Sequence, residues 1–248
     1  MSGIVIRLVL AIVVNAFIAF AAYRARLVSR SGAIGGFIVG LLIYFLTDWR
    51  GYVILFVFFT IGTLVTKVKY AEKAQKGIAQ ENQGRRGLRH AVANCLASLL
   101  LGLGAYIALL GGYPVAATVL MVGFTGAFAT ALSDTSSSEI GQAYGKTTVL
   151  LTSFRRVPPG TEGAVSLEGT IAGILGSLVL AVIGMLVGVA PGLAGLLAVV
   201  IAAFIGNTFE SIIGGTIEKV PFITNEVTNF INTVIGALAA MGIYALLT

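Results

Sequence analysis

Residues 114–139 read PVAATVLMVGFTGAFATALSDTSSSE, so that an uncharged run over 114–133 is followed at once by Asp134 and then by Glu139. An uncharged run of about 20 residues is what a helix needs to cross the hydrocarbon core of a bilayer. The stretch therefore predicts a membrane-spanning helix with a polar, acidic continuation at one end.

Similar apolar runs recur along the whole chain. Of its 248 residues, 57% are hydrophobic and 10% are charged, which is far from the balance of a soluble globular domain. We predict an all-α polytopic transmembrane helical bundle that forms a single integral-membrane domain over residues 1–248. About eight spans are expected, with seven or nine as alternatives. The predicted spans are 3–22, which we interpret as a retained helix rather than a signal peptide, 33–47, 51–66, 91–110, 114–133, 169–189, 192–209 and 228–247.

Basic residues gather in the connections after the first, third and fifth predicted spans. They are Arg24, Arg26, Arg30, Lys67, Lys69, Lys73, Lys76, Arg85, Arg86, Arg89, Lys146, Arg155 and Arg156. The connections near 48–50, 111–112 and 191–192 are short and almost uncharged. By the positive-inside rule, we expect the basic connections and the 210–226 loop in the cytoplasm and both termini outside, at the plasma membrane in a prokaryote.

Glycine and cysteine predict packing rather than chemistry. The single cysteine, Cys95, lies among apolar residues, where it cannot form an intrachain disulfide. Glycine pairs at four-residue spacing predict close helix–helix contacts, because small residues let helix backbones approach in a membrane. These pairs are Gly36 with Gly40, Gly169 with Gly173, and Gly184 with Gly188. The chain contains no Walker-type or GxGxxG phosphate loop.

Acidic residues at the ends of apolar spans are the first candidates for function. Five of the ten acidic residues lie there: Asp134, Glu139, Glu168, Glu210 and Glu218. An ionisable group close to the hydrocarbon is costly, which makes it a functional hypothesis by default. Carboxylates beside hydroxyls are hard oxygen ligands of the kind that magnesium prefers. If the segment is helical, Asp134 and Ser138 share a face. The alternative is that Asp134 and Ser133 only cap a helix.

Polar residues form two further clusters, and the second consists of amides. Asn207, Glu210 and Ser211 stand at three- and four-residue spacing and fall on one helical face. A row of amides, Asn225, Asn229 and Asn232, precedes the last span. Such amides suit oxygen coordination or phosphate binding, and equally they bridge helices.

Two more segments have both a functional and a structural interpretation. Arg85, Arg86 and Arg89 can grip phosphate with paired donors, or they can enforce topology and contact anionic lipid. The only histidine, His90, stands beside them, so that no zinc site is expected. Ser166 and Thr170 stand where the sixth span begins, either at an anion site or as a helix cap.

Taken in order, these segments resemble the integral-membrane family of phytyl-phosphate kinase and transmembrane protein 19. The resemblance extends over nearly the whole chain. One departure is Glu210, where the family motif has aspartate; the carboxylate is retained on a longer side chain. The matching segments are Arg89–Asn94, Ser133–Thr135, Ser138–Gly141, Gly163–Ser166, Gly169–Thr170, Ala172–Gly173, Glu210–Gly214 and Asn225–Phe230.

The resemblance implies a kinase that transfers a phosphoryl group from a nucleoside triphosphate, CTP or another, to an isoprenyl monophosphate such as phytyl, geranylgeranyl or farnesyl phosphate. The expected cofactor is Mg²⁺, held by Asp134, Glu139 and Glu210. Catalysis is expected from Asp134, Glu139, Arg86 and Lys146. Substrate and nucleotide contacts are expected from Arg85, Arg89, His90, Asn94, Ser138, Ser166, Thr170, Asn207, Ser211, Asn225 and Asn229.

The expected partners are the isoprenyl phosphate, the nucleotide and membrane lipid, without nucleic acid, and a homo-oligomer is left open. A lipid cytidylyltransferase or a polyprenol kinase would use the same cofactor and nucleotide and is separated by its product. A transporter is the alternative from another class. Transporter sites lie near the midplane on broken helices and inverted repeats, whereas here the charges collect at one face and the sequence has no convincing repeat.

Overall fold

The computed structural model describes residues 3–217 and 224–248, and the described chain is almost entirely helical, as predicted. A small two-stranded antiparallel sheet, which we did not predict, interrupts the helices. The elements are α1 (Gly3–Arg24), α2 (Arg30–Lys67), α3 (Tyr70–Gln75), α4 (Glu81–Gly84), α5 (Leu88–Leu110), α6 (Pro114–Tyr144), β1 (Thr148–Leu150), β2 (Ala164–Ser166), α7 (Leu167–Leu186), α8 (Gly192–Ile217) and α9 (Asn225–Leu247).

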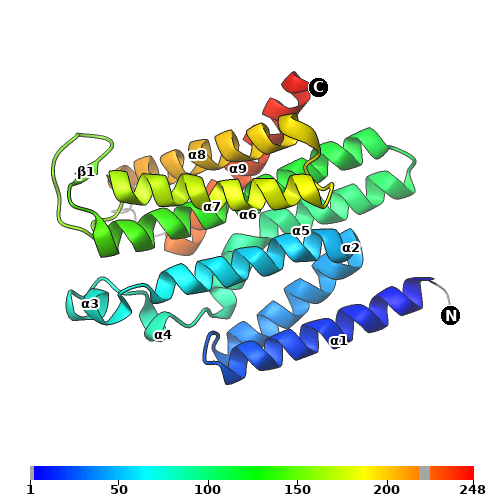
Figure 1. The fold of residues 1–248 in the computed structure, drawn as a ribbon, viewed down its shortest axis with the longest axis horizontal. Coiled ribbons are helices and arrows are strands. Elements are labelled where there is room, and N and C mark those ends of the chain that lie inside the picture. Colours follow the sequence, from blue (N-terminus) through cyan, green and yellow to red (C-terminus); the bar gives the residue numbers. More distant parts are fainter. Residues whose placement is uncertain (1–2, 218–223) are drawn as a thin grey trace.

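Helix α2 folds back on itself at Asp48, whose φ of 55° and ψ of −162° are not helical. The Asp48 carboxylate accepts a hydrogen bond from the Arg50 amide at 2.8 Å, so that it caps the second half. Gly32 and Gly62, in opposite halves, both lie against Arg86. Figure 1 shows the two halves side by side. The predicted spans 33–47 and 51–66 are therefore separate crossings joined by a bend rather than by a loop.

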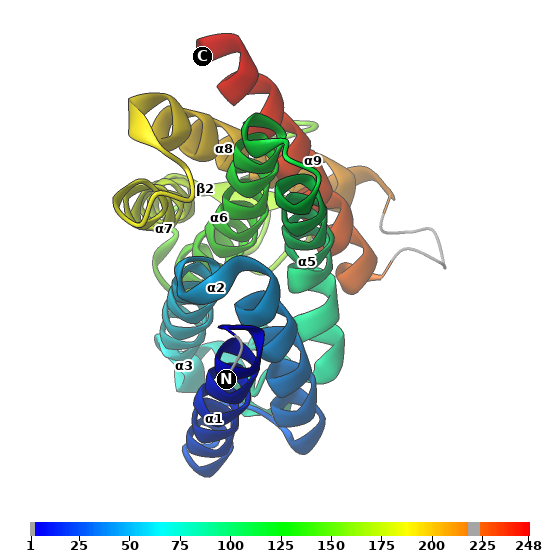
Figure 2. The ribbon, with the colours of Figure 1, turned by 90° about the vertical axis from the view of Figure 1, so that its right-hand side faces the viewer.

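Seven described helices are long and apolar enough to cross a membrane, and α2 is one of them. With the two halves of α2 counted separately, the number of candidate crossings among the described residues is eight, within the predicted range of seven to nine. In Figure 1 the labelled N and C ends lie at one end of the bundle, and α3, α4 and β1 lie at the other; Figure 2 views the bundle from the end that carries both termini. We call the end that contains the 68–87 and 145–166 segments the polar end.

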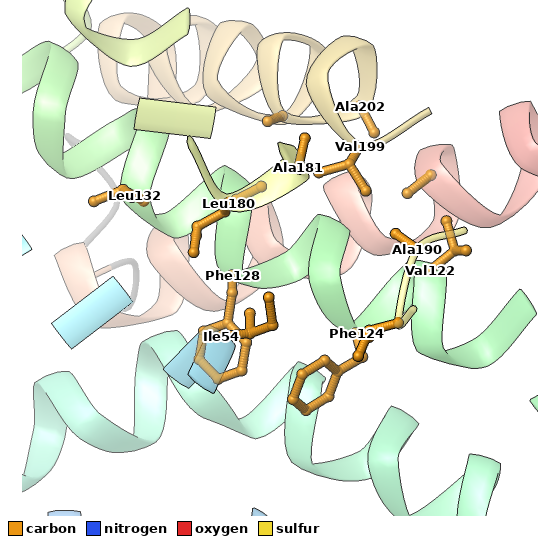
Figure 3. Close-up of a cluster of buried hydrophobic side chains, with 14 of the residues drawn as sticks. Ile54, Val122, Phe124, Phe128, Leu132, Leu180, Ala181, Ala190, Val199 and Ala202 are labelled. Atoms are coloured by element: carbon orange, nitrogen blue, oxygen red, sulfur yellow. The ribbon is translucent and has the colours of Figure 1, made fainter. Parts of the chain in front are cut away.

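Helix α6 occupies the centre of the bundle. Residues 122–133 are all buried, and Phe128 packs against Phe124 and Phe58 with ring centroids 5.1 and 5.3 Å apart. Figure 3 shows the α6 side chains meeting those of α7 and α8 in this core. The helix continues to Tyr144, beyond the predicted end at residue 133. Because Asp134 lies inside the helix, the helix-cap alternative for Asp134 was wrong.

The C-terminal end of α8 and the N-terminal end of α9 also differ from the prediction. Helix α8 continues to Ile217 and α9 begins at Asn225, so the predicted 210–226 loop is shorter. Consequently Glu210 and Ser211 lie on a helix. The sixth span begins with an observed cap, because the Ser166 hydroxyl accepts a hydrogen bond from the Gly169 amide at 3.1 Å.

Close packing confirms the role predicted for most of the paired glycines. A Cβ atom would collide with a neighbouring helix at Gly40, Gly169 and Gly173, and at Gly184 it would make a tight contact of 3.0 Å with Thr125. The packing prediction was wrong for Gly36 and Gly188, where a Cβ would meet nothing within 4 Å. Gly188 has a φ of 77° in the turn after α7, which a side chain would strain. Gly36 instead faces open space within a helix.

Glycines that were not paired also bring α8 and α9 onto α6. Thr130 of α6 is fully buried, and a Cβ on Gly206 or Gly236 would stand 2.5 or 2.8 Å from its side-chain carbons.

We expect Gly236→Ala to destabilise the protein by about 1–3 kcal/mol, because the buried threonine cannot move away. Thermal unfolding in detergent measures this. Gly242→Ala, also on α9 but beside open space, is the control and should be neutral or slightly stabilising; equal melting temperatures for the two variants would contradict this account of the packing.

Candidate functional site

A cavity of about 700 Å³ opens at the polar end of the bundle. Its walls are the polar end of α6, the first turns of α5, α7 and α9, the last turns of α8, the 77–86 segment and the 159–166 loop. Its volume lies within the range of about 300–1,000 Å³ that is usual for small-molecule sites. The lining residues come from positions 66 to 229 of the chain, so that the site exists only in the folded bundle.

The cavity wall is rich in carboxylates. Six of the ten acidic residues of the chain line it, beside three arginines. A phosphorylated ligand would therefore enter a wall with more negative than positive side chains, and it requires cations to accompany it. The six are Glu81, Asp134, Glu139, Glu162, Glu210 and Glu226, and the arginines are Arg85, Arg86 and Arg89.

Asp134 lies half-buried on the cavity side of α6. Ser138 shares that face as predicted, and its hydroxyl donates to the Asp134 carbonyl at 2.9 Å. Arg86, Glu139 and Glu162 all interact electrostatically with the Asp134 carboxylate. Asp134 thus lies within electrostatic reach of two other carboxylates and of the half-buried Arg86 side chain.

Glu139, one turn further along α6, forms an ion pair with Lys73 of α3. Both side chains are buried, at 8% and 1% exposure, and the Lys73 ammonium also donates to the Thr66 carbonyl at 3.2 Å. Two charges removed from water require this partnership. The pair ties the 68–87 segment to the central helix, and it occupies one oxygen of a carboxylate that we had predicted as a metal ligand.

Arg86 is held in place through its backbone and its side chain. Its amide donates to Leu27 and its carbonyl accepts from Ser29, at 3.2 and 3.1 Å, which pins it to the α1–α2 connection. Its guanidinium lies against Gly62 and 5.5 Å from the centre of the Phe58 ring. Burial lowers the pKa of Arg86, and nearby Cys95, Glu139 and Asp134 act in the opposite direction. The result is a fixed cation in the cavity wall.

His90 and Asn94 form the α5 side of the cavity. His90 Nε2 lies 2.7 Å from the Gln80 amide nitrogen, so that this ring nitrogen accepts and the other carries the proton. Asn94 donates through Nδ2 to the His90 carbonyl at 3.0 Å, which fixes the orientation of its amide. The Asn94 side-chain oxygen is buried and has no hydrogen-bond partner among the described residues. It is a hard acceptor available to a ligand or a cation.

Several predicted binding residues also have local structural bonds. The Ser166 hydroxyl accepts from the Gly169 amide in the turn that follows, and the Thr170 and Ser211 hydroxyls donate to carbonyls of the preceding turn. Asn207 of α8 donates to Ser133 and Ser137 of α6 at 3.4 and 3.2 Å, so it bridges two helices at the cavity floor. For Ser166 and Thr170 these contacts are the structural alternative considered from sequence, and all four residues line the cavity.

The β1–β2 hairpin supports the opposite wall. Thr148 pairs with Ser166 and Leu150 with Ala164. Gly163 has a φ of 70°, and a Cβ there would strike the α8 backbone at Gly215. Only glycine satisfies both conditions. The contact places Glu162 beside the end of α8 and within electrostatic reach of Asp134.

Most of the predicted site residues come together in this cavity. Lys146, which is exposed between α6 and β1, is not part of the lining among the described residues, and neither are the candidates Glu168 and Asn232. Glu218 lies outside the described residues. The predicted residues that line the cavity are Arg85, Arg86, Arg89, His90, Asn94, Asp134, Ser138, Glu139, Ser166, Thr170, Asn207, Glu210, Ser211, Asn225 and Asn229.

Sequence reasoning missed Lys73, Glu162 and Gln80 as parts of the site. Lys73 was counted only among the basic residues of a connection, and its partner Glu139 is 66 positions away. No local spacing could have found that pair. Glu162 carried a weak signal, because it immediately precedes Gly163 in the motif of the family resemblance.

The carboxylates are spread around the cavity rather than collected at one point. Within residues 3–217 and 224–248, no group of three histidine, cysteine, aspartate or glutamate side chains could hold a metal ion by itself. Asp134, Glu139 and Glu210 therefore do not form a three-carboxylate site. This arrangement still fits Mg²⁺, which usually takes one or two carboxylates and completes its shell with water and substrate phosphates.

Comparison with known proteins gives a family for the chain. The family model described as integral membrane protein DUF92 matches residues 13–237. An uncharacterized membrane protein of Synechocystis sp. is 40% identical over 237 residues, 95% of this chain and 90% of that protein. An uncharacterized membrane protein of Methanocaldococcus jannaschii is 29% identical over 242 residues, which are 98% of this chain and 96% of that protein.

A plant relative is similar over a smaller part of its own length. Protein VTE6, chloroplastic, of Arabidopsis thaliana is 39% identical over 220 residues, which are 86% of this chain and 64% of that protein. No solved structure matches the chain. The family match and the two relatives at about 40% identity confirm the resemblance predicted from the motifs, and the chain belongs to the DUF92 family of integral membrane proteins.

Proposed function

We propose that the protein is a kinase that transfers the γ-phosphoryl group of a nucleoside triphosphate to an isoprenyl monophosphate, with Mg²⁺ as cofactor. The observation that carries the proposal is the cavity at the polar end, where carboxylates outnumber arginines at the edge of a membrane bundle. Such a wall suits a phosphate ligand that arrives with divalent cations. The family membership and the resemblance to phytyl-phosphate kinase motifs support the same reaction.

The acceptor needs no general base in this reaction. A phosphate monoester has a second pKa of about 6, so at neutral pH its oxygen is mostly ionised and nucleophilic. That oxygen attacks the γ-phosphorus, the bond from the γ-phosphorus to the β,γ-bridging oxygen breaks, and the nucleoside diphosphate leaves. The surroundings of His90 agree with a reaction that needs no general base. Its Nε2 is hydrogen-bonded to Gln80, and it has no hydrogen bond to a carboxylate among the described residues.

Catalysis then depends on positioning two anions and neutralising their charge. Arg86, fixed at the junction of α2 and α5, is suited to hold the acceptor phosphate, while Arg85 and Arg89 extend the basic side of the cavity toward its mouth. Asp134, with the Asn94 oxygen or Glu210, would hold magnesium. When bound, that ion would neutralise the triphosphate and stabilise charge on the transferring group.

We also propose that the polar end faces the cytoplasm, where nucleoside triphosphates are found. The basic connections lie at this end, and the positive-inside rule assigns it to the cytoplasm. A cysteine-accessibility experiment on whole cells tests this orientation: Lys146→Cys should resist an impermeant maleimide until the cells are opened.

The reaction is tested with purified protein in nanodiscs. Farnesyl, geranylgeranyl and phytyl monophosphates are offered with each nucleoside triphosphate, and the lipid products are separated by chromatography. We expect a prenyl diphosphate, loss of turnover when EDTA removes divalent metal, and recovery with excess Mg²⁺. Release of inorganic diphosphate would indicate a cytidylyltransferase instead, and turnover of a free prenol would indicate an alcohol kinase. Folded protein that turns over none of these acceptors would refute the proposal.

A further inference from the structure

A second, apolar cavity lies beside the polar one. It occupies about 100 Å³ between α1, both halves of α2 and the start of α5. Its walls are almost entirely aliphatic and aromatic, with Ile18, Val39, Leu55 and Phe59 among them. The buried amide of Asn15 at its far end already donates to the Ala11 carbonyl at 2.8 Å. We call this cavity the apolar groove.

The apolar groove and the polar cavity share two wall residues, Arg86 and His90. Arg86, therefore, is a half-buried cationic side chain that lines the polar cavity on one side and the apolar groove on the other. An amphiphile with an anionic head and a hydrocarbon tail matches this junction. Inorganic phosphate has no part that would occupy the apolar side.

The groove extends from the polar end into the membrane-spanning region. Its α1 wall runs from Ala22 to Asn15, a depth of about 10 Å along the helix. Phe56 in its wall is 44% exposed, so the groove is not sealed from the surrounding bilayer. A chain longer than the groove can leave sideways into the lipid.

We infer that the apolar groove binds the first isoprene units of the lipid substrate, with its phosphate on Arg86. This inference rests on the proposed function and deepens it, since it assigns the tail to a particular set of helices. The groove has room for this occupant because Gly36 in its wall has no atom within 4 Å of the position of a Cβ. The same open space gives the inference a clean test.

Gly36→Leu would place a branched side chain in the wall of the groove, at a position where its Cβ atom has no neighbour within 4 Å. With geranylgeranyl monophosphate, we expect kcat/KM to fall about tenfold or more, because the tail loses buried contact area. A five-carbon prenyl monophosphate should lose much less, so the variant should change the order of chain-length preference. Gly242→Leu is the matched control, since Gly242 is an exposed helical glycine of α9 that also faces open space.

A second measurement needs no turnover. A prenyl monophosphate with a photoreactive diazirine on its first isoprene unit is bound in nanodiscs without nucleotide, and labelled peptides are identified by mass spectrometry. We expect label in residues 15–22 and 32–39, reduced by Gly36→Leu but not by Gly242→Leu. If wild-type protein lacks kinase activity but shows this labelling, the proposed function fails and the tail site stands. Two results would overturn the tail site and leave the proposed function standing. One is kinase activity with the photoreactive label found outside residues 15–22 and 32–39, and the other is equal kcat/KM for Gly36→Leu and Gly242→Leu.

Discussion

Asp134→Asn is expected to lower the rate of prenyl diphosphate formation by about a hundredfold or more while the protein stays folded. The substitution keeps the size of the side chain and removes its negative charge. If that charge holds the cation that neutralises the triphosphate, several kcal/mol of transition-state stabilisation are lost, and each 1.36 kcal/mol corresponds to a factor of ten. The rate is measured at saturating Mg²⁺ and again over a range of Mg²⁺ concentrations.

Asp48→Asn is the matched control for this variant. It makes the same chemical change at the bend of α2, where asparagine tolerates the positive φ and its side-chain oxygen can still accept from the Arg50 amide. Full activity is expected there. If Asp134→Asn retained wild-type turnover with unchanged Mg²⁺ dependence, Asp134 would have no part in metal binding, and Glu162 and Glu210 would become the residues to substitute.

Lys73→Met is expected to cause the largest loss of stability, about 3–5 kcal/mol, because it leaves the buried Glu139 carboxylate without its cation. Part of this loss disappears if Glu139 takes up a proton in the variant. The measurement is thermal or denaturant unfolding in detergent, followed by circular dichroism. The polar end should open first, since the pair joins α3 to the central helix, and protease cleavage within 68–87 should report this.

Two further variants separate charge pairing from a general effect of losing a lysine. Lys76→Met removes an exposed charge next to α3 and should change stability by less than about 1 kcal/mol. The double variant Lys73→Met with Glu139→Gln has no unpaired charge and should recover much of the stability. A double variant as unstable as Lys73→Met alone would show that the pairing is not what holds the segment.

The sequence was sufficient for the architecture because a bilayer constrains helices by length. Apolar runs predicted eight spans, and the basic connections predicted that one end of the bundle is polar. Helix ends were predicted less well, because the chain does not stop being helical where it stops being apolar. Helix α6 continues past Ser133 for three turns, and the polar residues of those turns, Asp134 and Glu139 among them, form the cavity wall.

The site residues that could be predicted are those whose polar or charged groups are energetically costly to place near hydrocarbon. Carboxylates, amides and arginines at span ends are energetically costly to keep near hydrocarbon, and most of those selected on that ground line one cavity. What the sequence could not provide was pairing across long separations, as between Lys73 and Glu139, or the open space at Gly36, which was attributed to packing because of its spacing from Gly40. Both depend on how α2 and α3 lie against the rest of the bundle.

The unequal burial of the helices has a consequence for how such a chain can change during evolution. In α6, alanine, glycine, serine and threonine are packed at zero or nearly zero exposure over residues 122–133, so almost any enlargement there collides with a neighbour. In α1 most side chains face outward and only need to remain apolar, apart from Asn15 and the few others that are buried. Substitutions should therefore accumulate quickly in α1 and slowly in α6, and a random library selected for activity should display the same gradient.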